Sequence, residues 1–206
     1  MFYKLTFDMD RIDTAIEEGT NTIYAEKTNI DDIEYPNIKK GFFDNIIYTN
    51  GGKVIQSWPD VKFYYSSRAS DLESEYLLNA KRWPIIHKKV QQKFEEAGIE
   101  GIQYLPIKLI DVVTNEVNYN YVVINVLNFI EAYDLEKSKY KYNEKYSVYT
   151  FLPHETYLDE KVCSNYDIFR CKKSILSLYV SQKIKDLAHD NQWIGFEFYP
   201  QKLNND

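Results

Sequence analysis

Two segments of the chain share the same order of apolar and polar positions. Residues 84–106 and 178–200 align without a gap, with Gly101 opposite Gly195, and each ends on a proline. In each segment apolar residues recur three and four positions apart, which places them on one face of a helix, and a glycine turn and a short alternating strand follow. The pattern predicts a duplicated helix-turn-strand unit, because two copies are too few for a solenoid.

The two predicted helices differ where they begin. His87 stands at the position where the second copy has Ser181. Serine is among the preferred N-cap residues and histidine is not. We therefore expect the first helix to have an altered cap.

Most of the remaining chain shows strand patterns. Residues 2–7 alternate apolar and polar side chains, which is typical of a half-buried edge strand. The apolar runs 107–113 and 119–127 flank the polar residues 114–116 and predict a hairpin. Further strands are expected at residues 147–152 and 167–171.

The N-terminal part has its own helix and turn signals. Residues 10–18 carry apolar side chains at helical spacing before a glycine and predict a short helix. The apolar runs 42–48 and 54–55 flank an Asn-Gly-Gly turn at residues 50–52. Asn-Gly supplies the positive φ angles of a tight turn, so this stretch predicts a second hairpin.

These patterns together predict the fold class. Runs of strands with few helices favour an α+β fold, a mostly antiparallel sheet with segregated helices that contains the pseudo-duplicated unit. The 206 residues are enough for one domain with a sizeable core. Within one compact domain we expect residues 1–80 to form a β-rich N-terminal portion and residues 81–206 to form the α+β portion.

Charge and apolar run lengths narrow the function. The chain has 25 basic and 31 acidic residues, a net charge of −6, which disfavours both a general nucleic-acid binder and a polybasic membrane anchor. The first residues lack a signal-peptide core, and no apolar run reaches the roughly 20 residues of a membrane span. We therefore expect a cytoplasmic protein that binds neither membranes nor nucleic acid directly.

Signatures of catalysis and metal binding are missing from the sequence. It contains no glycine-rich phosphate loop, nucleophile elbow or His-Glu-x-x-His motif. Cys163 and Cys171 match neither zinc-ligand nor redox spacing, and His87, His154 and His189 fall where surface or capping roles are expected. The sequence predicts no catalytic residue, no metal ligand and no cofactor, and we expect that the protein is not an enzyme.

Two segments combine acidic residues with an aromatic one. One interpretation is an ordinary solvated loop or helix start. The other is an acidic surface with aromatic anchors that docks a basic partner. On that interpretation the candidate partner contacts are Asp31, Asp32, Glu34 and Tyr35 in the first segment and Asp71, Glu73, Glu75 and Tyr76 in the second.

A third segment alternates basic and aromatic residues. The order of lysines and tyrosines over residues 137–149 predicts an exposed amphipathic ribbon. Such a ribbon can stack on single-stranded nucleic acid. Glu136 and Glu144 interrupt its positive charge, which disfavours that use.

Taken in order, several motifs resemble family eleven of the bacterial polymorphic-toxin immunity proteins, formerly a domain of unknown function. The resemblance covers roughly residues 83–200, whereas the first 80 residues match poorly. The motifs lie at residues 101–106 (Gly-Ile-Gln-Tyr-Leu-Pro), 121–128, 133–138, 168–170, 180–181 and 195–198.

The resemblance implies the function of an antidote. A family member would bind one cognate toxin in the cytoplasm of the producing cell and block it non-covalently, without catalysis or a cofactor. Many toxins of such systems are basic nucleases, and an acidic inhibitor can imitate their polyanionic substrate, so a basic nuclease is an expected partner. The alternatives are an enzyme with an unrecognised pocket and, less favoured, a module that binds single-stranded nucleic acid.

Overall fold

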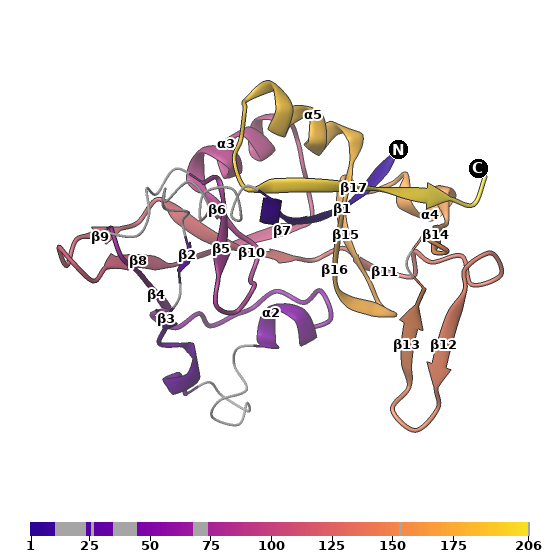
Figure 1. Ribbon diagram of the computed structural model, residues 1–206, viewed down its shortest axis with the longest axis horizontal. Helices are drawn as coiled ribbons and strands as arrows, with labels where there is room; N and C mark the ends of the chain where they lie inside the picture. Colours follow the sequence, from indigo (N-terminus) through magenta and orange to yellow (C-terminus); the bar gives the residue numbers. More distant parts are fainter. Residues whose placement is uncertain (11–23, 26, 35–44, 68–73, 153, 206) are drawn as a thin grey trace.

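The fold contains the predicted α+β duplication, and its described residues form four sheets that are mostly antiparallel (Figure 1). The computed structural model describes residues 1–10, 24–25, 27–34, 45–67, 74–152 and 154–205.

The first copy consists of a strand, a helix and a second strand. A further strand lies between these two strands in the sheet. β6 (Ile85–His87) leads directly into α3 (Lys88–Glu96), and β7 (Ile102–Pro106) follows. Both strands pair antiparallel with β10 (Tyr121–Val126). The amphipathic pattern forms α3 because its apolar positions all face the sheet, where they are buried.

The second copy repeats this arrangement. β16 (Ser174–Ser181) leads into α5 (Gln182–Asp190), and β17 (Phe196–Leu203) follows. The strand between them is β1 (Phe2–Phe7), which pairs antiparallel with both. The two helices therefore begin and end at aligned positions of the two copies, as the sequence alignment predicts.

The duplication extends to the strand register. Val122 of β10 lies opposite Pro106, and Tyr3 of β1 lies opposite Pro200, the aligned proline. In the first copy the central strand, β10, comes after the helix in the sequence. In the second copy the central strand, β1, comes long before the helix. The prediction that residues 2–7 form an edge strand is wrong, because β1 is hydrogen-bonded on both sides.

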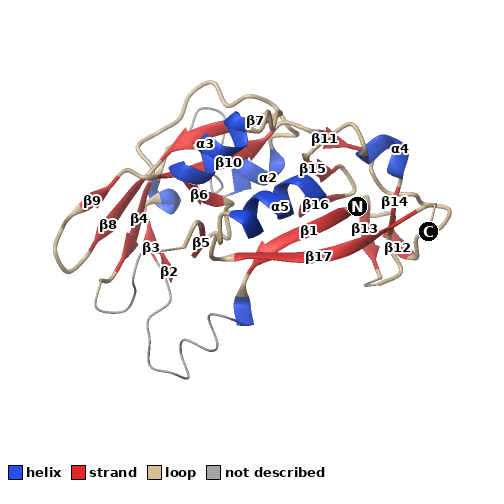
Figure 2. Cartoon of the chain, turned by 90° about the horizontal axis from the view of Figure 1, so that it is seen from above, coloured by secondary structure: helices blue, strands red, loops and turns tan. Residues whose placement is uncertain are grey.

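The two copies share one hydrophobic core. Figures 1 and 2 show α3 and α5 side by side over the same side of the sheets. Val90 and Phe94 of α3 and Ile184 of α5 belong to the same buried cluster, together with residues of β1 and β10. Sharing a core in this way makes the copies parts of one packed body.

Short strands extend both sheets. The six-stranded sheet has the order β11-β15-β16-β1-β17-β14, and the five-stranded sheet has the order β2-β5-β6-β10-β7. The added strands are β11 (Phe129–Ile130), β15 (Ile168–Cys171), β14 (Tyr157–Leu158), β2 (Tyr24–Ala25) and β5 (Tyr76–Asn79).

The hairpin predicted from the apolar runs 107–113 and 119–127 is wrong, because only the first of these runs lies in a separate four-stranded sheet. Its order is β3-β4-β8-β9, where β8 (Lys108–Asp111) turns into the two-residue β9 (Val117–Asn118). Residues 121–126 do not pair with β8 but form β10 in the five-stranded sheet. All six side chains of β10 are buried, so it occupies a central position with both faces covered. The other two strands are β3 (Lys27–Thr28) and β4 (Lys62–Tyr65).

The second predicted hairpin is also wrong. Ile46–Thr49 forms the short helix α2, and no strand follows at residues 54–55. Gly51 and Gly52 do adopt positive φ angles of 67° and 75°, so the turn chemistry is as expected. The turn follows a helix because Ile46 and Ile47 are consecutive buried residues, which an alternating strand would place on opposite faces. Residues 42–44, and the helix predicted at residues 10–18, lie outside the described residues.

The fourth sheet has two strands and stands apart from the body. β12 (Tyr140–Asn143) and β13 (Val148–Phe151) form a hairpin that projects from one end of the molecule (Figure 1). The strands expected at residues 147–152 and 167–171 are therefore confirmed, the latter as β15. A short helix, α4 (Glu160–Cys163), begins after the hairpin, where the Asp159 side chain accepts hydrogen bonds from its first backbone N–H groups.

Hydrogen bonds cross the predicted division of the chain at residue 80. β1 lies between β16 and β17, and β5 pairs with β6. The division into residues 1–80 and 81–206 stays a prediction. Among the described residues, no helix has both the length and the apolar character of a membrane span.

Glycine at position 195 is required by a close approach of backbone. A Cβ there would lie 2.3 Å from both Ser74 Oγ and the Tyr76 carbonyl oxygen, and φ is +92°. We expect Gly195→Ala to lower the free energy of unfolding by about 3 kcal/mol or more, from overpacking and backbone strain together. Urea denaturation measures this difference.

Gly98→Ala is the matched control. Gly98 also has a positive φ of +67°, but nothing lies within 4 Å of its Cβ position. Gly98→Ala should lower the free energy of unfolding only by the cost of backbone strain, about 1 kcal/mol. Equal losses at the two glycines would contradict a steric requirement at Gly195.

Candidate partner-binding surface

The first acidic segment forms an exposed turn. The 3₁₀ helix η1 (Ile30–Asp32) is held by Ile30, which is fully buried in the core under the four-stranded sheet. The polar side chains therefore point outward, and Asp32 and Glu34 are exposed. The Asp31 carboxylate accepts a hydrogen bond from Lys81 Nζ at 2.8 Å. Tyr35 lies outside the described residues.

The described end of the second acidic segment lies inside the fold. Asp71 and Glu73 lie outside the described residues, and Glu75 and Tyr76 are buried, at 5% and 4% exposed. Glu75 forms an ion pair with Lys89 and accepts a hydrogen bond from the Ile194 N–H at 2.6 Å. Its carboxylate thus joins the helix of the first copy to the strand entry of the second.

Tyr76 completes the same junction between the copies. Its ring stacks on Phe7 at 4.6 Å between centroids and on Phe196 at 5.0 Å. Burial raises the pKa of its hydroxyl, so the side chain is neutral. Of the eight predicted contact residues, the structure places Asp31, Asp32 and Glu34 at the surface.

The β12–β13 hairpin presents a ladder of aromatic rings. Tyr140 lies opposite Phe151 and Tyr142 lies opposite Tyr149, so all four side chains fall on one face. Neighbouring ring centroids within the hairpin are 4.6 to 6.0 Å apart. At the end nearest the body, the Phe151 ring lies 4.1 Å from the ring of Tyr133. The ladder continues to the buried core, because Tyr133 and Tyr179 share a hydroxyl hydrogen bond of 2.6 Å.

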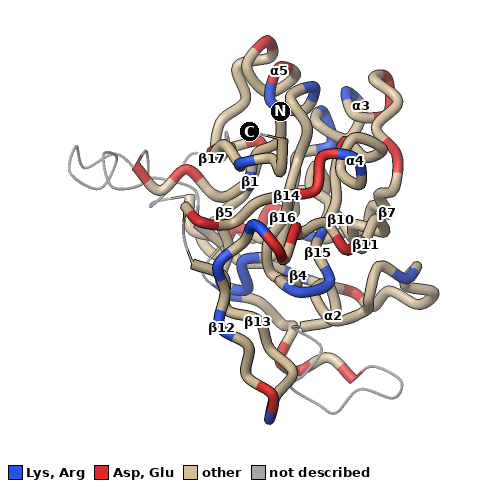
Figure 3. Tube along the Cα trace, turned by 90° about the vertical axis from the view of Figure 1, so that its right-hand side faces the viewer, with Lys and Arg blue, Asp and Glu red and all other residues tan. Residues whose placement is uncertain are grey.

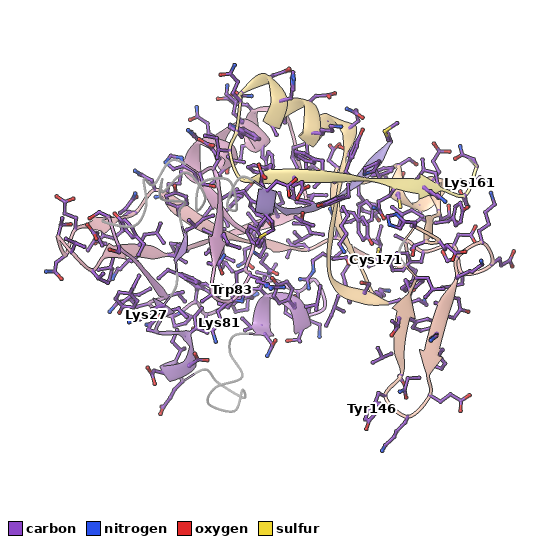
Figure 4. All side chains as sticks on the ribbon, viewed as in Figure 1. Lys27, Lys81, Trp83, Tyr146, Lys161 and Cys171 are labelled. Carbon is purple, nitrogen blue, oxygen red and sulfur yellow. The ribbon has the colours of Figure 1, made fainter. Side chains whose placement is uncertain are left out.

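The outer half of this hairpin is exposed. Tyr142 is 47% exposed and Tyr146, at the tip, is 65% exposed (Figure 4). Basic positions follow the hairpin, with one acidic position near its tip (Figure 3). The Lys145 ammonium lies 5.2 Å from the centre of the Tyr146 ring. The exposed ribbon predicted from residues 137–149 is confirmed as an aromatic and basic surface.

The hairpin tip is fixed by local polar contacts. The Asn143 side chain accepts a hydrogen bond from the Tyr146 N–H at 3.3 Å, and Ser147 adopts a positive φ of 52°. At the base Ser138 Oγ bonds to the Tyr157 carbonyl oxygen and accepts from its N–H. A two-stranded ribbon is marginal alone, so these contacts and the aromatic ladder hold it in place.

Two thiols and one histidine that could do nucleophilic or acid–base chemistry have structural positions instead. Cys163 and Cys171 are free thiols and fully buried, and burial raises the pKa of Cys163 to about 12. His87 Nδ1 accepts a hydrogen bond from the Lys89 N–H, so it caps α3, and burial lowers its pKa. The two caps do differ, but in the opposite sense to the expectation: the histidine caps its helix, whereas Ser181 makes no cap bond and its hydroxyl donates to Asp167 instead. Among the described residues, no group of three or more His, Cys, Asp or Glu side chains could hold a metal ion.

The family comparison covers nearly the whole chain. The model of the immunity protein family Imm11 matches residues 2–203. The match begins about 80 residues before the segment on which the sequence resemblance rests, which agrees with β1 being a central strand of the second copy. No curated protein matches the chain.

The two acidic segments should respond differently to mutation. Glu75→Ala removes a buried carboxylate that serves Lys89 and Ile194, and we expect the free energy of unfolding to fall by about 3 kcal/mol. Asp32→Ala, at an exposed position, should change it by less than about 0.5 kcal/mol. Urea denaturation of the two variants makes the comparison, and a negligible loss for Glu75→Ala would contradict its structural role.

Proposed function

We propose that this chain, which belongs to the Imm11 immunity protein family, binds one cognate bacterial toxin in the cytoplasm of the producing cell and neutralises it by non-covalent inhibition. Nothing in the proposal requires catalysis. The buried thiols and the capping histidine have structural uses, and the described residues suited to contact with a partner lie at the surface.

The β12–β13 hairpin is the docking element in this proposal. Exposed aromatic side chains in a contiguous group mark protein contact sites, and tyrosine is among the residues that contribute most to binding free energy. The Tyr142 ring is held before binding by its contact with Tyr149, so little of its side-chain entropy is lost on association, and the Asn143 contact fixes the backbone at Tyr146. The exposed aromatic hairpin is the observation that carries this part of the proposal.

Charge indicates what kind of toxin fits. The net charge of −6 attracts a basic protein at long range, and the exposed carboxylates Asp32 and Glu34 add to that field. A basic nuclease is the toxin class we propose on this ground. At contact, Lys141 and Lys145 of the hairpin need acceptor groups on the toxin, so its docking site combines an apolar cleft with local carboxylates or carbonyls.

Binding of single-stranded nucleic acid is the second candidate function. The alternation of lysine and tyrosine on the hairpin favours it, because bases stack on aromatic faces beside cations. Glu136 and Glu144 and the negative net charge oppose it. Tight binding of an oligothymidine that weakens steeply with salt would favour this function over toxin docking.

Capture followed by a growth assay tests the neutralising function. The tagged chain is used to isolate its partner from the source organism, and the partner's C-terminal domain is then expressed with and without the chain. We expect growth to stop when the domain is expressed alone and to recover on co-expression. A partner domain that is harmless alone contradicts the proposal.

Substitutions then locate the docking surface. Tyr142→Ser with Tyr146→Ser should weaken toxin affinity by about 100-fold, because each removes an exposed aromatic anchor. Tyr119→Ser removes an exposed tyrosine from another surface and should leave affinity within about threefold. Calorimetric titration of the purified toxin domain gives both values.

A charge-neutralised variant separates the two candidate surfaces. Asp32→Asn with Glu34→Gln should slow association, most strongly at low salt, and leave dissociation nearly unchanged. If this variant abolishes binding while the tyrosine variant binds normally, the toxin docks on the acidic turn and the hairpin assignment is wrong.

A further inference from the structure

A cavity lies between the two copies of the duplicated unit. It has a volume of about 380 Å³, within the range of small-molecule sites. Equivalent positions of the two central strands line it, Leu5 and Phe7 of β1 and Ile124 and Val126 of β10. Tyr48 of α2 lines another part of its wall. The duplication therefore creates the cavity where the two central strands approach each other.

The charge of this cavity is opposite to that of the chain. Lys4, Lys81, Arg82 and Arg170 line it, and none of the described lining residues is acidic. Lys81 pairs with Asp31, which leaves three cations without a carboxylate partner among the described residues. A chain with a net charge of −6 thus gathers four basic side chains at one site.

Arg170 is the buried member of this group. It is 4% exposed, and its guanidinium donates to the carbonyl oxygens of Ile47, Tyr48 and Ile175, all of them neutral acceptors. Burial lowers its pKa to about 10, so it is charged at neutral pH. A buried cation without a counter-charge is costly, and an anion beside it would lower that cost.

Structural use of Arg170 does not account for the other lining residues. Its carbonyl contacts tie α2 to β15 and explain its burial. They do not explain why Arg82 and Leu176, which is 70% exposed, line the same cavity.

One wall of the cavity is aromatic and uncharged. The Tyr48 ring lies 4.9 Å from the Arg170 guanidinium, and its hydroxyl donates to the Arg82 carbonyl oxygen. Burial raises the pKa of Tyr48 to about 12, so no phenolate neutralises the neighbouring cations at neutral pH. The wall therefore offers an apolar face next to positive charge.

We propose that this cavity binds a small organic anion, whose phosphate or carboxylate group contacts Lys4, Arg82 and Arg170 and whose apolar body lies against Tyr48 and Leu176. The site is separate from the docking hairpin and does not depend on the toxin. The lysine and arginine side chains that line the cavity recognise the anionic group, and the aromatic and leucine side chains select for an apolar body.

Titration with phenyl phosphate in a phosphate-free buffer tests the proposal. Phenyl phosphate combines a dianion with an aromatic ring, while inorganic phosphate and phenol each supply one half. We expect one calorimetric site that binds phenyl phosphate at least about 10-fold more tightly than either half-ligand. No saturable binding of phenyl phosphate up to about 10 mM would overturn the proposal.

Three variants place the binding in this cavity. Lys4→Met and Arg82→Met should each weaken phenyl phosphate binding by about 10-fold, because each removes a charged contact. Leu176→Ser should weaken phenyl phosphate but not inorganic phosphate, since it alters only the apolar contact. Arg170 is left intact because it holds α2.

Lys88→Met is the matched control. Lys88 is exposed at the start of α3 and does not line the cavity. Its substitution should leave the affinity for phenyl phosphate unchanged. Binding that survives both Lys4→Met and Arg82→Met unchanged, or that falls equally in Lys88→Met, would show that the anion binds elsewhere and overturn the assignment.

Discussion

The fold depends on the contact through which the two copies of the duplicated unit meet. Tyr76, from β5 of the five-stranded sheet, stacks on Phe7 and Phe196 of the six-stranded sheet. This contact is possible only because Gly195 has no side chain, since a Cβ there would clash with the backbone of Tyr76. By fixing the two sheets against each other, it lets one core serve both helices and sets the spacing of β1 and β10, between which the cavity lies. The duplicated unit is thus stabilised as a pair.

Local sequence patterns predict where the helices and strands of this fold form better than they predict which strands pair with each other. The helices α3 and α5 follow from apolar periodicity and the glycines behind them, all within about 20 residues. The sheet position of β1 does not, because alternation reports which side chains are buried and is silent about which strands lie alongside. The same holds for β10, whose partners β6 and β7 precede it by 15 residues or more while β9 is adjacent. Tertiary pairing decides these cases.

The candidate surfaces also show that local sequence does not predict tertiary neighbours. The segments around Asp32 and Glu75 have nearly the same composition, yet Asp32 is exposed and Glu75 is buried. Glu75 is buried because Lys89 and the Ile194 N–H reach it from elements that sequence proximity does not connect to it. The aromatic ribbon was predictable because its cross-strand pairs form within one hairpin. The cavity was not, since it is assembled from five separate stretches of chain.

Net charge and local charge answer different questions in this protein. The charge of −6 governs encounter at distances up to the Debye length of about 8 Å at physiological ionic strength and beyond it in dilute salt. Recognition inside a cavity depends instead on the few groups that line it, where water screens less. Lys81 connects the two, because it lines the cavity and pairs with Asp31 of the acidic turn. An acidic chain can therefore carry a cationic site without conflict, because the Asp31 carboxylate pairs with Lys81 and does not itself line the cavity.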